Sequence, residues 1–205
     1  MNPKDHWEKV YSKVPADKMG WYEPHLRLSL NWIQGLGLVK DAPIIDVGGG
    51  SSTLVDDLLD AGFSAITVLD ISEKALMSAQ ARLGARSKGV TWLYGDIATI
   101  ELPRERYELW HDRAMFHFLL AEEQQEKYLQ QLERGLTPNG HLIIGAFAPE
   151  APPQCSGLSV RRYDTVDIES TLGPTFELKR CRKDLHVTPG GVEQMYLYCH
   201  FMKVG

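Results

Sequence analysis

The sequence predicts an α/β fold, a three-layer sandwich whose seven-stranded, mainly parallel sheet ends in an antiparallel C-terminal hairpin. Short apolar runs alternate with amphipathic stretches over most of the 205 residues. Strands and helices that alternate at this spacing form right-handed crossovers and pair in parallel. Near the C-terminus two long strand-like runs are joined by Thr188-Pro189-Gly190-Gly191, a connection typical of a hairpin.

The individual elements follow from the hydrophobic period of each segment. Short apolar runs, typical of strands buried on both faces, predict strands over residues 43–47, 65–69, 90–93, 107–110 and 141–147. Two long strand-like runs predict the strands of the hairpin over residues 176–186 and 192–202. Apolar residues at helical spacing predict helices over residues 5–11, 25–36, 52–61, 72–83, 122–134 and 165–172. Ser72 is the expected N-cap of its helix, because its hydroxyl can accept from a free N–H group of the first turn.

Composition and charge exclude several classes of protein. Hydrophobic residues make up 43% and charged residues 24% of the chain, as in an average globular domain. The formal net charge of −5 argues against a general affinity for nucleic acid. No run approaches the ~18 apolar residues that span a bilayer, and the first residues lack the apolar core of a signal peptide. We therefore expect neither a nucleic acid nor a membrane partner.

The three cysteines, Cys155, Cys181 and Cys199, are odd in number and widely spaced. This pattern predicts neither a disulfide framework nor a zinc site. Asp112 alone does not make a site for a hard metal ion either, so we expect no metal. Such cysteine usage is typical of the reducing cytoplasm, which is the location we expect.

A ligand site is predicted where the first three strands end. Gly48-Gly49-Gly50 lets the backbone approach a ligand closely, although such a turn also serves merely to reverse the chain. Asp70, 22 positions beyond Gly48, can accept both hydroxyls of an adenosine ribose; the alternative is a solvated capping carboxylate beside Ser72. Asp96 follows the third strand. A nucleoside in the crevice beyond these strands would meet all three groups.

The residues around the glycines favour a zwitterionic nucleoside over a dinucleotide. The dinucleotide fingerprint ends in a third glycine, whereas this chain has Thr53 there. Asp46 precedes the glycines, where it would sit poorly beside a diphosphate but suits the ammonium of an amino-acid tail. We therefore expect an adenosine cofactor with such a tail rather than NAD.

Four motifs in order resemble those of class I S-adenosylmethionine-dependent methyltransferases, a Rossmann-like superfamily. They are residues 44–52, 68–72, 94–97 and 136–142. The resemblance covers residues 41–147, and the predicted hairpin fits the reversed seventh strand of the family. It implies S-adenosylmethionine as cofactor and S-adenosylhomocysteine as product. We expect one domain made of a helical N-terminal cap or lid, a cofactor-binding core, and a substrate-side loop, helix and hairpin, at residues 1–36, 41–147 and 148–205.

The resemblance also implies roles for the motif residues by matching position. The glycines and the acid before them would hold the methionine part, the acid after the second strand the ribose, and the third motif the adenine. The implied cofactor residues, in that order, are Asp46, Gly48, Gly49, Gly50, Asp70, Ile71, Asp96 and Ile97. The segment His111-Asp112-Arg113 departs from many relatives, so the family does not indicate the acceptor.

Two residues beside the predicted cleft are candidates for catalysis. His111, just after the fourth strand, can take a proton near neutral pH and would also contact the cofactor. The alternative is a histidine hydrogen-bonded to a neighbouring loop. Tyr22 and its neighbour Trp21 can place aromatic rings over a sulfonium or a cationic acceptor, with Tyr22 as the second catalytic candidate.

Other residues are candidates for binding the acceptor. Arg113, Arg162 and Tyr163 could meet an anionic acceptor, although a solvated pair is the alternative for the last two. Trp7 and Tyr11, four apart on one helical face, are expected to pack an N-terminal helix onto the sheet.

These residues favour a methyltransferase that acts on a small molecule, because the cap is short and no recognition domain follows the core. One alternative is a protein-lysine methyltransferase. An alternative of another class is a nucleoside-binding module without catalysis, or a nicotinamide oxidoreductase.

Overall fold

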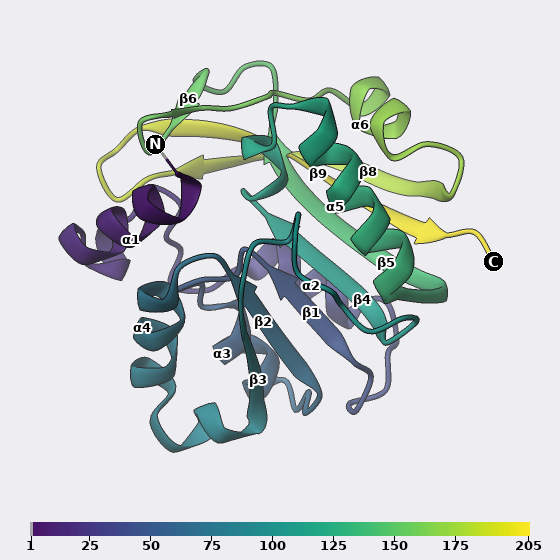
Figure 1. Cartoon of the computed structure of the whole chain (residues 1–205), viewed down its shortest axis with the longest axis horizontal. Coiled ribbons are helices and arrows are strands. Elements are labelled where there is room, and N and C mark those ends of the chain that lie inside the picture. The colour runs from purple at the N-terminus through teal and green to yellow at the C-terminus, as the bar shows by residue number, and fades with distance from the viewer. Residues whose placement is uncertain (1) are drawn as a thin grey trace.

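The computed structural model describes residues 2–205 and contains the predicted seven-stranded sheet. Its strands are β1 (Ile44–Val47), β2 (Ile66–Asp70), β3 (Val90–Tyr94), β4 (Tyr107–Arg113), β5 (Leu136–Phe147), β8 (Phe176–Val187) and β9 (Glu193–Lys203). They lie in the order β3-β2-β1-β4-β5-β9-β8 (Figure 1). Strands β1 to β5 pair in parallel, while β9 runs antiparallel to both β5 and β8. The predicted parallel sheet with a terminal hairpin is confirmed.

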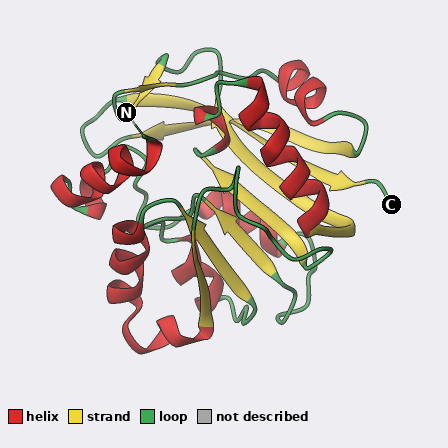
Figure 2. Cartoon of the chain, viewed as in Figure 1, coloured by secondary structure: helices red, strands yellow, loops and turns green. Residues whose placement is uncertain are grey.

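Helices cover both faces of this sheet (Figure 2). They are α1 (Pro3–Lys13), α2 (Arg27–Gln34), α3 (Leu54–Asp60), α4 (Glu73–Leu83), α5 (Glu122–Gly135) and α6 (Thr165–Leu172). Short 3-10 turns occur at Ala16–Lys18, Gly84–Gly89 and Phe116–Phe118, and a two-stranded hairpin joins β6 (Gln154–Cys155) to β7 (Leu158–Ser159).

Alternation along each strand divides the core into two layers. On β1, Ile45 packs into the cluster that includes α5 and α6, whereas Ile44 packs into the cluster that includes α2, α3 and α4. Successive strand residues point to opposite faces, so a continuous apolar run fills both clusters at once. The predicted three-layer sandwich is confirmed.

The strand order places a topological switch at β1, which has β2 on one side and β4 on the other. The connections after these strands leave in opposite directions, and a crevice opens beyond their carboxyl ends. Register brings Asp46 of β1 opposite His111 of β4. Two residues far apart in sequence thus meet where a ligand site is expected.

The cysteines differ from the expectation. Cys181 and Cys199 form a disulfide between β8 and β9, while Cys155 is free and buried. The physical reason is register: the two cysteines stand directly opposite each other in the hairpin. The cytoplasmic location stays a prediction, and the disulfide weakens its basis, because disulfides are rare in reducing compartments. None of the helices within residues 2–205 has the length and apolarity needed to cross a bilayer.

Candidate functional site

A cavity of about 590 Å³ lies beyond the carboxyl ends of β1 to β4. This volume is within the range of small-molecule sites. Five of the residues expected to hold the cofactor line it, namely Gly48, Asp70, Ile71, Asp96 and Ile97. The cavity extends past β4 to α1, to the start of α5 and to the turn before β7.

The glycine turn after β1 requires glycine for steric reasons. Gly48 has φ +69°, and a Cβ there would lie 2.5 Å from Met115 Cβ. A Cβ on Gly49 would lie 2.5 Å from Asp46 Oδ2, and one on Gly50 would lie 2.7 Å from Asp70 Oδ2. Of the three, Gly48 lines the large cavity, Gly49 a smaller one described below, and Gly50 lines neither. Gly50 instead makes room for the Asp70 carboxylate.

Asp70 is a buried acid in an unfavourable electrostatic environment. Its Oδ1 accepts a hydrogen bond of 2.7 Å from Ser72 N. Burial, aided by the nearby charges of Asp46 and Glu8, raises the pKa of Asp70 to about 7. The carboxylate therefore lines the cavity as an acceptor that would gain from additional hydrogen-bond donors.

The third strand contributes a more open acid and an apolar wall. Asp96 is half-buried, and its Oδ1 accepts from Ala98 N at 2.9 Å in the turn after β3. Ile97 is buried beside it, and Ile71 follows Asp70 on the same side of the cavity. The predicted nucleoside residues of β2 and β3 thus share one half of the cavity.

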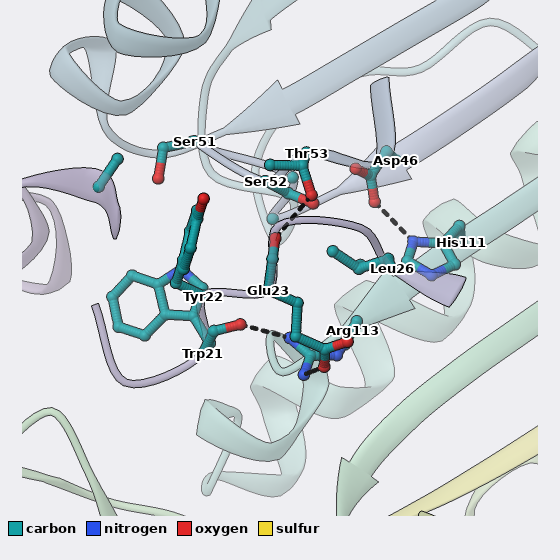
Figure 3. A pocket seen from close by; sticks show the side chains of 13 residues that line it. Trp21, Tyr22, Glu23, Leu26, Asp46, Ser51, Ser52, Thr53, His111 and Arg113 are labelled. Carbon is teal, nitrogen blue, oxygen red and sulfur yellow. Dashed lines mark hydrogen bonds and ion pairs between the residues drawn. The ribbon is translucent and has the colours of Figure 1, made fainter. Parts of the chain in front are cut away.

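A second, smaller cavity of about 20 Å³ lies beside the glycine turn and includes Asp46 and His111 (Figure 3). His111 Nδ1 is 2.7 Å from Asp46 Oδ1, and its Nε2 is 2.9 Å from Ser29 Oγ. All three side chains are buried. Because both ring nitrogens are engaged, the geometry favours a histidine held by its neighbours over His111 as a general base.

Arg113 joins the two cavities. It lines both of them, as do Trp21 and Gly48. Its guanidinium donates to Trp21 O at 2.8 Å and to Glu23 Oε1 at 2.5 Å, and lies 4.7 Å above the Tyr196 ring centre. Its buried Nε has no hydrogen-bond partner within residues 2–205. Arg113 is therefore a guanidinium held in place, and paired with Glu23, where β4 meets the cavity.

The residues just before α2 are held by several elements. Glu23 Oε1 lies 3.2 Å from His186 Nδ1 of β8 as well as against Arg113, and Thr53 Oγ1 donates to Glu23 O. These charged partners hold the pKa of Glu23 below its usual value although burial acts in the opposite direction. Tyr22 lines the smaller cavity, and Figure 3 shows its ring extending toward Ser51 and Ser52.

Two of the residues expected to bind the acceptor lie elsewhere. Arg162 donates to the backbone oxygens of Pro149 and Ala151, at 2.9 and 3.2 Å, and so fixes the proline-rich loop after β5. Tyr163 is fully buried and packs 5.6 Å from the ring of Phe116 in the core. Neither lines either cavity, because the chain at Tyr163 returns to bond the backbone of Phe147.

Helix α1 contributes residues to the cavity that sequence reasoning treated as packing or did not consider. Trp7 and Tyr11 line the large cavity together with His6. The Trp7 ring lies 5.0 Å from that of Phe118 and 5.7 Å from that of Trp21. The signal in the sequence was the aromatic pair four residues apart, which indicates one helical face but not the surface that it meets.

Two contacts fasten α1 over the cavity. Glu8 Oε1 accepts from Glu73 N, at the start of α4, at 2.6 Å. His6 Nε2 lies 3.1 Å from Ser156 O, in the turn between β6 and β7. The helix therefore connects the two sides of the cavity.

The fold and the site together define a class. The strand order, the one reversed strand and the cavity at the carboxyl ends of β1 to β4 are those of a Rossmann-like methyltransferase. The family model for the methyltransferase domain matches residues 44–140. Together these findings support a class I S-adenosylmethionine-dependent methyltransferase.

Individual relatives are distant. The chain is 27% identical over 139 residues to the eEF1A lysine and N-terminal methyltransferase of Bos taurus, a match covering 68% of this chain and 20% of that protein. It thus spans about a fifth of that relative's length.

Solved structures resemble the chain over nearly all of its length. An S-adenosylmethionine-dependent methyltransferase from Anabaena variabilis has a TM-score of 0.74 at 18% identity, covering 99% of this chain and 96% of that one. A 1,6-didemethyltoxoflavin-N1-methyltransferase from Burkholderia thailandensis, with bound 1,6-didemethyltoxoflavin and S-adenosylhomocysteine, has a TM-score of 0.70 at 17% identity, covering 98% and 84%. At these identities the likeness shows the fold.

Proposed function

We propose that the protein transfers a methyl group from S-adenosylmethionine to a small-molecule acceptor. The observation that carries this proposal is the large cavity in which Asp70 and Asp96 lie beyond successive strands, beside the bare turn at Gly48. Carboxylates at these strand ends, in a fold that binds ligands at that edge, suit the hydroxyls and amino group of a nucleoside.

The residues fit the proposed cofactor. The charged groups acting on the buried Asp70 are both acidic, so ribose hydroxyls would supply hydrogen bonds that it needs. Asp96 would accept from the adenine amino group, with Ile71 and Ile97 as apolar walls. Asp46 Oδ2 faces the turn at Gly49, where it would accept from the ammonium of the methionine part.

The chain's own contribution is to align the acceptor and exclude water. When bound, S-adenosylmethionine supplies an activated methyl group on a sulfonium. Helix α1 covers the cavity, and the rings of Trp7 and Trp21 line it, where they would attract the positive charge of the sulfonium. Arg113 would orient the acceptor. Tyr22 and His111, which line the smaller cavity, would support the methionine end rather than exchange protons with the acceptor.

The comparisons support two acceptor classes. The likeness to the enzyme that binds didemethyltoxoflavin supports a small molecule, and the volume of the cavity, about 590 Å³, agrees with it. The likeness to the eEF1A lysine and N-terminal methyltransferase favours a protein lysine as the second candidate.

Calorimetric titration with S-adenosylhomocysteine and with NAD tests the cofactor. We expect binding of the first and none of the second; the reverse would favour an oxidoreductase. Incubation with labelled S-adenosylmethionine and either a metabolite extract or a cell lysate then tests the acceptor, because the labelled product is small in one case and of protein size in the other. Binding without any labelled product would favour a module without catalysis.

A further inference from the structure

We propose that the half of the large cavity next to β4 binds a planar aromatic acceptor with an ionisable hydroxyl, and that His6 accepts the proton of that hydroxyl. This inference rests on the proposed methyl transfer. It adds the chemical class of the acceptor and a catalytic residue.

The sheet topology divides the cavity into two halves. Residues that follow β1, β2 and β3 form one half, with Asp70 and Asp96. Residues that follow β4, together with α1 and the β6–β7 turn, form the other. Gly48 and Arg113 lie where β1 and β4 adjoin. A nucleoside held by the first half leaves the second for the acceptor.

The charge of the second half disfavours an ammonium. Among the described residues that line it, Arg113 carries the one permanent charge, and no Asp or Glu is present. The nearest acid to Arg113, Glu23, lines the smaller cavity instead. A lysine ammonium in this half would therefore meet a guanidinium and no acid of its own, whereas a hydroxyl that ionises would form an anion beside that guanidinium, whose charge Glu23 offsets in part.

The shape of the second half favours a flat molecule. The centre of the Trp7 ring lies 5.0 Å from that of Phe118 and 5.7 Å from that of Trp21, and both pairs meet edge to face. Leu119 and Leu158 add apolar surface to this half, and the polar side chains of Tyr11, Gln124 and Ser159 also line it. Aromatic rings in such an arrangement accept another ring edge-on or stacked, while they offer few hydrogen-bond partners to a polar chain.

His6 is the residue placed to take the proton. It lines the cavity on α1, and its Nε2 lies 3.1 Å from the carbonyl oxygen of Ser156. A carbonyl only accepts, so Nε2 carries the hydrogen and the lone pair is on Nδ1. Within residues 2–205 no hydrogen bond engages Nδ1. By contrast, both nitrogens of His111 are engaged.

The proposed step is a simple proton transfer. The acceptor's O–H bond breaks, its electron pair stays on oxygen, and the proton bonds to the Nδ1 lone pair of His6. The products are an oxyanion beside the Arg113 guanidinium and an imidazolium that donates through Nε2 to Ser156 O. The oxyanion is then the nucleophile for the methyl group.

The test uses 4-nitrophenol, whose phenolate absorbs visible light, bound to the full chain saturated with S-adenosylhomocysteine. We expect the ratio of phenolate to phenol to be about tenfold higher for the bound probe than for the free probe at the same pH, which corresponds to a shift of one pKa unit. His6→Gln retains a donor toward Ser156 O but lacks a basic nitrogen, so it should bind the probe and lose most of this ionisation. Lys9→Gln, on the exposed side of α1, is the matched control and should behave as the wild type.

The outcomes of this experiment distinguish a failure of the proposed role of His6 from a failure of the proposed function. Unchanged ionisation in His6→Gln, or a probe that does not bind, would overturn the inference while leaving cofactor binding intact. The same holds if the ammonium of N-acetyl-lysine methylamide displaces the probe at lower concentration than 2-naphthol does. Failure of S-adenosylhomocysteine to bind in the first place would instead refute the proposed function.

Discussion

Replacing Asp70 by Asn should stabilise the free protein at alkaline pH and weaken its hold on the cofactor. Burial raises the pKa of Asp70 from 3.8 to about 7. Between these values the native state keeps a proton that the unfolded chain releases, so the acid destabilises the fold increasingly as pH rises from about 4 to 7. Asn carries no charge, and its amide oxygen can still accept from Ser72 N.

The magnitude follows from the pKa shift. From pH 5 to pH 7 the native group resists ionisation over about two pH units, at 1.36 kcal/mol each. The unfolding free energy of Asp70→Asn, relative to wild type, should therefore grow by about 2 to 3 kcal/mol between pH 5 and pH 8. Urea unfolding at the two pH values measures it. In the same variant the affinity for S-adenosylhomocysteine should fall by about 1 to 3 kcal/mol, the scale of a lost charged hydrogen bond.

A structural role for Asp70 would give the opposite pattern. If Asp70→Asn is destabilised at pH 8, or changes stability equally at both pH values, the acid is not an electrostatic burden on the free protein. If affinity for S-adenosylhomocysteine is unchanged, Asp70 does not contact the ribose.

Three further predictions concern the framework of the site. Glu23→Gln leaves Arg113, whose side chain is 5% exposed, without its counter-charge and should lower the unfolding free energy by about 2 to 4 kcal/mol in urea; a loss below about 0.5 kcal/mol would contradict this. Cys199→Ser removes the disulfide between positions 18 residues apart and should lower the unfolding free energy by about 3 kcal/mol. The control Cys155→Ser keeps the disulfide, so a reductant should lower its unfolding free energy as much as it lowers that of the wild type. Burial lowers the pKa of His117 to about 3, so below about pH 6.5 the unfolded chain binds a proton that the native state does not, and the unfolding free energy falls as pH drops. His117→Asn should reduce this dependence of the unfolding free energy on pH. An unchanged dependence would contradict the assignment.

Much of the half of the cavity that we propose for the cofactor was predictable, because its information is local. A buried strand reads as a continuous apolar run, and the residue after it lies at one edge of a parallel sheet. Asp70 and Asp96 could therefore be placed in one crevice without knowing any contact. The glycines could be placed there too, although the structure shows that Gly50 makes room for Asp70 rather than lining the cavity.

The half of the cavity that we propose for the acceptor was not predictable in the same way, because its contacts are distant in sequence. The Trp7 ring contacts the ring of Phe118, although Trp7 precedes the first strand in the sequence and Phe118 follows the fourth. No spacing rule relates two residues so far apart in sequence. Arg162 and Tyr163 looked like candidates because they follow a loop, but the loop folds back on β5 and buries Tyr163.

The spacing of two cysteines about the predicted turn carries a signal for the disulfide. Cys181 and Cys199 are equally distant from Gly190, the centre of the predicted hairpin turn. A turn at that position places the two cysteines opposite each other on adjacent strands. Odd number and wide spacing along the chain conceal a pair that register brings together.

The most direct test of the central claim is a crystal structure of the protein grown with S-adenosylhomocysteine. We expect the ribose hydroxyls at the Asp70 carboxylate and the adenine between Ile71 and Ile97, with its amino group toward Asp96. A nucleoside bound outside the cavity, or one whose ribose lies away from Asp70, would contradict the assignment of this strand edge as the methyl donor site.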